Sequence, residues 1–69
     1  MELQTAVWKE DNTYIIKEVI TGVTTQGKTI EEAMKNIKEA VELYLEEMPE
    51  VKRELKGMKT IGAVSVEIA

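Results

Sequence analysis

Residues 22 to 29 match the spelling of a phosphate-binding P-loop: a glycine, four further residues, and then Gly-Lys-Thr. Such a loop wraps its backbone N–H groups around nucleotide phosphates, while the terminal hydroxyl binds Mg²⁺. The flanking pattern also fits, because a β-like apolar run covers residues 14–20 and a periodic helix is predicted from residue 30. By spelling alone, this segment would bind ATP or GTP.

The residue types inside the loop argue against a nucleotide site. The four interior positions hold Val23, Thr24, Thr25 and Gln26, and β-branched residues prefer extended backbone to the glycine-assisted curl of an anion site. Mg²⁺ would need a second carboxylate on another buried strand, but the only aspartate, Asp11, lies upstream in a polar turn. A 69-residue chain is also short for the parallel sheet of such enzymes. We therefore predict a short strand over these four residues.

Other catalytic chemistry has few residues to use, since the chain contains no His and no Cys. Glu31 and Glu32 are adjacent on the predicted helix, where successive side chains point about 100° apart and do not converge. Thr29 and Glu32 instead have the spacing of a capping box, which satisfies backbone donors at a helix start. We expect no catalytic, cofactor-binding or metal-binding residues and no enzymatic activity.

A helix over residues 30–48 is the clearest predicted element, because its apolar residues recur every three or four positions. Pro49 ends the helix. The stripe that we expect to face the sheet consists of Ile30, Ala33, Met34, Ile37, Ala40, Val41, Tyr44, Leu45 and Met48.

The remaining pattern predicts an α+β domain, a single unit over residues 1–69, in which an antiparallel sheet carries one long helix on one face. The expected order is β-β-β-α-β, with a charged connector that carries a helical turn from Glu50 to Lys56. In the last strand, Val64, Val66 and Ile68 alternate with polar residues and are expected to point inward. The expected strands cover residues 2–9, 13–20, 23–26 and 60–68.

Composition narrows the possible partners. The net charge of −4 works against nonspecific nucleic-acid binding and favours basic partners. No apolar run approaches the roughly 20 residues that span a bilayer, and the start of the chain lacks a basic region followed by an apolar one. We expect a cytoplasmic protein without membrane contact and without direct nucleic-acid binding.

Both faces of the predicted sheet carry apolar side chains, because the consecutive residues Ile15 and Ile16 point to different faces, as do Val7 and Trp8. One helix covers only one face, and so small a domain buries only about 60% of the surface that its unfolded chain exposes. We therefore expect a homodimer or a higher homo-oligomer.

The run from Gly22 to Leu45 contains a characteristic set of residues: Gly22, Val23, Thr25, Gly27, Thr29, Glu31, Glu32, Ala33, Asn36, Glu39, Ala40, Leu43, Tyr44 and Leu45. Through this set the run resembles the HicB family, the antitoxin halves of bacterial and archaeal toxin–antitoxin pairs. That family carries a glycine, a small residue, Thr, Gly and Thr, followed by Glu-Glu-Ala and a long helix. Two positions differ from the usual pattern: Thr21 replaces a proline and Val23 replaces a frequent cysteine.

The resemblance implies a HicB-like domain, likened to a partial ribonuclease H fold, and a partner that is a small basic mRNA-cleaving toxin of the HicA type. Many HicB proteins add a C-terminal DNA-binding domain. Nothing of that kind follows the present domain in this sequence, so we do not expect direct promoter binding. The expected function is neutralisation of the toxin by protein–protein contact, and the alternative is an orphan oligomeric structural or regulatory domain without a toxin.

Candidate interface residues follow from charge and exposure. Glu39, Glu42 and Glu46 share one predicted helical face and could attract a basic toxin; alternatively, they form a solvated face partly paired with neighbouring lysines. Trp8 has no place in the helix-facing core, so it is either an interface anchor or a cover for the core edge. One cluster of basic residues occurs in the sequence, at Lys52, Arg53, Lys56 and Lys59. It has no aromatic residues between its members, so we expect a solvated connector and no RNA contact.

Overall fold

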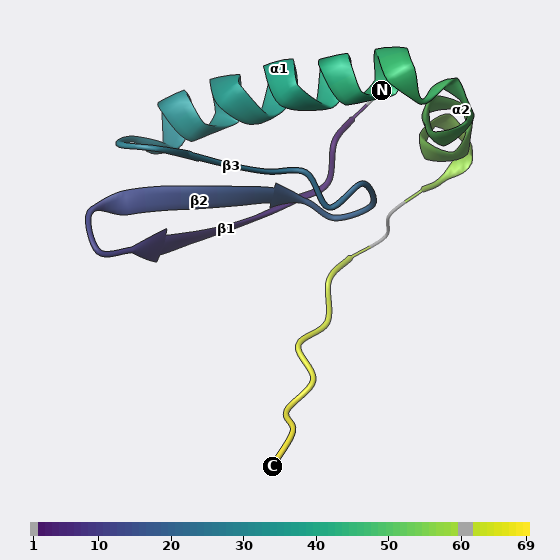
Figure 1. Cartoon of the computed structure of the whole chain (residues 1–69). Coiled ribbons are helices and arrows are strands. Elements are labelled where there is room, and N and C mark those ends of the chain that lie inside the picture. The colour runs from purple at the N-terminus through teal and green to yellow at the C-terminus, as the bar shows by residue number, and fades with distance from the viewer. Residues whose placement is uncertain (1, 60–61) are drawn as a thin grey trace.

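The computed structural model describes residues 2–59 and 62–69 and confirms the α+β class (Figure 1). In this part of the chain, a three-stranded antiparallel sheet precedes two helices. The elements are β1 (Thr5–Glu10), β2 (Thr13–Glu18), β3 (Thr24–Gly27), α1 (Ile30–Glu47) and α2 (Pro49–Gly57).

The first two strands form the expected hairpin, although each strand is shorter than the sequence pattern suggests. Asp11 lies in the connecting turn with a φ of 53°, a left-handed conformation that Asp tolerates better than most residues. The register pairs Val7 with Ile16 and Trp8 with Ile15. Strand β2 lies at the centre of the sheet, between β1 and β3.

Side chains alternate between the two faces of the sheet, and α1 packs on β2 and β3 from one side. Ile16 is buried on this covered face. Because Ile15 and Trp8 are paired one position along, they share the opposite, uncovered face. The prediction that apolar residues occupy both faces is therefore confirmed.

The segment with the P-loop pattern contains a strand in place of a phosphate-binding loop. Residues Thr24–Gly27 are β3, where Thr25 pairs with Ile16 of β2, so these backbone groups belong to a sheet. Gly22 has a φ of +78° in the preceding turn. Gly27 is required by close packing, because a Cβ atom there would lie 2.6 Å from the backbone nitrogen of Ala33. Both glycines of the P-loop pattern therefore have structural roles: Gly22 allows the turn, and Gly27 allows the close packing of β3 against α1.

Helix α1 begins at the predicted cap. The Thr29 hydroxyl accepts a hydrogen bond from the Glu32 backbone N–H at 3.0 Å, and the Glu32 carboxylate accepts one from the Lys28 N–H at 3.4 Å. The second bond lands one residue before the position that a standard capping box would use. Four predicted core residues are buried at a spacing of four, namely Ala33, Ile37, Val41 and Leu45.

Three residues of the predicted core stripe are exposed: Ile30, Met34 and Met48. Met34 is 55% exposed. The helix lies over β2 and β3, and Met34 borders a groove on the β1 side that no other described residue fills. Met48 caps the junction between the helices, where the chain turns into α2.

The segment after α1 differs most from expectation. Residues 49–57 form a full helix, α2, instead of a single turn, and Leu55 joins the core. The strand expected over residues 60–68 is wrong for residues 62–68, which form no strand; residues 60 and 61 lie outside the described part. Val64, Val66 and Ile68 are 79–88% exposed, because this segment has no neighbouring strand to pair with in the described chain.

Candidate protein-interaction surfaces

The outer face of α1 is acidic over the second half of the helix, from Glu39 to Glu47. Glu39, Glu42 and Glu46 are all exposed, and Leu43, between them on the helix, is 61% exposed. The last turn of α1 contains Glu46 and no basic residue, and the helix dipole does not favour a carboxylate there. An exposed leucine within a negative surface has the chemistry of a docking surface for a basic partner with an apolar contact.

Trp8 lies on the opposite side of the molecule, on the uncovered face of the sheet. It is 39% exposed, and its indole N–H donates to the Glu10 carboxylate at 3.1 Å. Ile15 is the paired neighbour on this face and is half-buried. The structure therefore separates Trp8 from the three glutamates of α1, and the predicted interface residues form two surfaces instead of one.

A groove beside β1 was not predicted from the sequence. Its volume is about 360 Å³. Polar groups border it at Thr5, Lys38 and Glu42, whereas its walls are mainly apolar. The sequence indicates this groove only in part: Met34 belongs to the apolar stripe of α1 but lies beyond the residues that the sheet covers. The apolar wall consists of Leu3, Ile16, Met34, Ile37, Val41 and Leu45.

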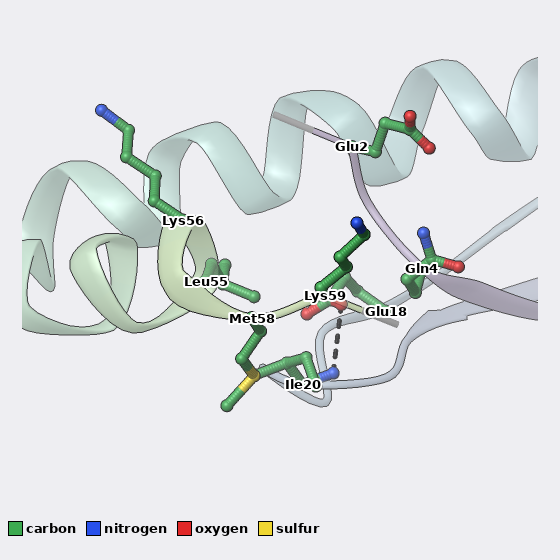
Figure 2. A pocket seen from close by; sticks show the side chains of 8 residues that line it. All are labelled: Glu2, Gln4, Glu18, Ile20, Leu55, Lys56, Met58 and Lys59. Carbon is green, nitrogen blue, oxygen red and sulfur yellow. Dashed lines mark hydrogen bonds between the residues drawn. The ribbon is translucent and has the colours of Figure 1, made fainter. Parts of the chain in front are cut away.

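Glu18 is the buried acidic residue of the described chain, and sequence reasoning missed it. Its carboxylate accepts a hydrogen bond from the backbone N–H group of Ile20 at 3.1 Å (Figure 2). It accepts a second one from the backbone N–H group of Thr21 at 2.6 Å. Burial alone raises the pKa of this carboxyl, but the hydrogen bonds from Thr21 and Ile20 outweigh burial and hold the pKa below its usual value. The ionised carboxylate therefore fastens the turn between β2 and β3.

Glu18 also borders a second cavity of about 560 Å³ between the start of β1 and the end of α2. Lys56 and Lys59 line this cavity with Gln4, Ile20, Leu55 and Met58 (Figure 2). The basic cluster of the sequence is exposed along α2 and just after it, at Lys52, Arg53, Lys56 and Lys59.

Within residues 2–59 and 62–69, no group of three or more metal-ligating side chains gathers in one place. Neither described helix combines the length and the apolar character needed to cross a bilayer.

The elements define a small α+β domain with a three-stranded antiparallel sheet and two helices. Residues 2–63 match the model of a family of unknown function, DUF7387, and the chain belongs to this family. It is 40% identical over 60 residues to a UPF0150 protein of Archaeoglobus fulgidus, covering 86% of this chain and 81% of the relative. It is 34% identical over 70 residues to a UPF0150 protein of Helicobacter pylori, covering 100% and 97%. No solved structure matches it significantly.

Proposed function

We propose that this protein is a cytoplasmic, antitoxin-like module of the HicB type that binds a small basic mRNA-cleaving toxin and blocks it by protein–protein contact. In this proposal the chain performs no chemistry. It also associates with itself, as a homodimer or a higher homo-oligomer.

The single observation that carries the proposal is the acidic outer face of α1, built by Glu39, Glu42 and Glu46 around the exposed Leu43. A toxin that cleaves mRNA needs a positive surface to bind phosphates. A negative helix face is complementary to such a surface and would compete with RNA for it. The resemblance of residues 22–45 to HicB proteins supports the same partner.

The direct test is to purify the chain with a HicA-like toxin encoded in the same genome and to measure RNA cleavage. Protection of RNA at stoichiometric ratio, together with a complex that survives gel filtration, is the expected result. Absence of a complex at micromolar concentration would reject the proposal and leave an oligomeric domain without a toxin as the better description.

A further inference from the structure

The outer edge of β1 offers unpaired backbone groups. The Val19 N–H donates to the carbonyl of Gln4, the residue just before β1, at 2.8 Å. Even-numbered residues along β1 therefore direct their backbone N–H and C=O groups toward β2. In an antiparallel pair the direction alternates, and Thr5, Val7 and Lys9 therefore direct their N–H and C=O groups outward. No strand of the described chain pairs with this edge.

The other edge of the sheet is partly closed. Strand β3 has only four residues, and the outward-facing carbonyl of Gln26 accepts a hydrogen bond from the Asn36 side chain at 2.8 Å. Helix α1 thus occupies part of the β3 edge. An additional strand would find its free positions along β1, because exposed edge groups are a template for pairing.

The apolar groove of about 360 Å³ runs beside the same β1 edge, between Leu3 on one side and Met34 of α1 on the other. A strand added to β1 would place every second side chain on the covered face of the sheet, beneath α1. Edge and groove therefore fit one occupant: an extended segment with apolar residues at alternate positions.

Segment 62–69 has this pattern. Val64, Val66 and Ile68 alternate with Ser65 and Glu67, and the three apolar residues are 79–88% exposed. The segment is extended and leads away from its own sheet and helices (Figure 1). Eight residues in extended form span about 26 Å, at roughly 3.3 Å each, which is enough to line the six residues of β1.

We propose that segment 62–69 of one copy adds to the outer edge of β1 in a second copy, with Val64, Val66 and Ile68 filling the groove, and that the exchange is reciprocal. The second copy is the chosen occupant because the segment leaves its own sheet and because one exchange covers the free edge and the exposed segment of both chains at once. The proposal specifies how the self-association in the proposed function occurs, and it needs no toxin.

The first test compares molar masses by light scattering at about 100 μM. The wild-type chain is expected to be a dimer. Val66→Lys places a charge in the groove and should raise the dissociation constant at least tenfold, whereas the matched control Glu67→Lys changes the outward side of the same segment and should remain dimeric. Since Val66 is exposed in the single chain, the Val66→Lys variant should retain the helical circular-dichroism signal of α1 and α2. A monomeric wild type, or a Val66→Lys variant as dimeric as the control, would overturn the proposal.

The second test separates exchange from folding back onto the same sheet. The chain has no cysteine, so Ala6→Cys and Ser65→Cys can be made as single variants, both expected on the uncovered face. The two variants are unfolded together, refolded and treated with a short bismaleimide. A covalent heterodimer is expected; its absence, with an internal cross-link in the double variant instead, would show that the strand adds to its own chain. Neither test contains toxin, so failure here leaves RNA protection as a separate result.

Discussion

Glu18 shows how a single acidic side chain can organise a turn. It ends β2, and its two oxygens accept N–H groups from the following turn at Ile20 and Thr21. Its backbone also joins the turn, because its N–H donates to the Val23 carbonyl and its carbonyl accepts from the Gly22 N–H. The side chain is therefore a structural anchor whose ionisation is linked to folding.

We expect Glu18→Gln to lower the free energy of unfolding at pH 7 by about 1–3 kcal/mol, since charged hydrogen bonds are replaced by weaker ones and one oxygen is lost. The folded-state pKa lies below the unfolded value of about 4.3. The contribution is therefore complete above the unfolded pKa and is lost as the pH falls through the folded pKa. Urea titrations from pH 7 to pH 3 should show the difference between wild type and variant shrinking. The exposed Glu54→Gln is the control, and an equal effect there would contradict the assignment.

Gly27 has a structural role that a substitution can test. Gly27→Ala should cost about 1–3 kcal/mol of unfolding free energy, because the added Cβ would lie 2.6 Å from backbone of Ala33 and must push β3 and α1 apart. Gly57→Ala is a matched control, since a Cβ at that helical position meets nothing within 4 Å. The control should be neutral or slightly stabilising. Equal losses in the two variants, measured by urea unfolding, would show that the close approach is not important.

Among the helices and strands, α1 could be predicted almost completely from sequence. Periodicity gives its length, and Thr29 gives its first turn. We expect Thr29→Ala to lower the free energy of unfolding by about 1 kcal/mol through loss of the bond to the Glu32 N–H, whereas Thr29→Ser should retain most of it. Thermal unfolding of both variants provides the measurement, and a Ser variant as weak as Ala would argue against capping.

Other elements were less predictable for identifiable reasons. Periodicity placed Met34 in the core, but exposure depends on where α1 crosses the sheet, which is a tertiary property. Alternation placed a strand after residue 60, but a strand needs a partner, and the pattern cannot say which chain supplies it. Glu18 looked like an ordinary strand carboxylate, because its hydrogen bonds are fixed by a turn that no motif describes. Trp8 was correctly excluded from the covered core.

Charge reversal can test the acidic face of α1. Reversing Glu39, Glu42 and Glu46 to Lys should slow association with the toxin at low salt by about tenfold or more, because complementary charge steers encounter. Stopped-flow or surface-plasmon measurements at two salt concentrations would give the rates. A control with the same change in net charge reverses the exposed Glu2, Glu50 and Glu54. Equal slowing in both variants would assign the effect to net charge alone.

The hydrophobic core of the described chain is thin. Its buried apolar residues come mainly from one stripe of α1, together with Ile16 and Leu55, and the chain has no disulfide to add stability. If copies exchange segment 62–69, folding and association are linked. The midpoint of thermal unfolding should then rise with protein concentration from about 5 μM to 500 μM, and a concentration-independent midpoint in the Val66→Lys variant would provide the contrast.

The alternation of backbone direction along β1 has a consequence for amide hydrogen exchange. In an isolated chain the outward amides of Thr5, Val7 and Lys9 face solvent and should exchange with deuterium quickly, while the inward amides of Ala6 and Trp8 are held by β2. The hairpin would therefore show a protection pattern with a period of two residues. Any strand that adds to this edge, whichever chain supplies it, would erase that pattern, so the kinetics of five consecutive amides report directly on whether the sheet ends at β1.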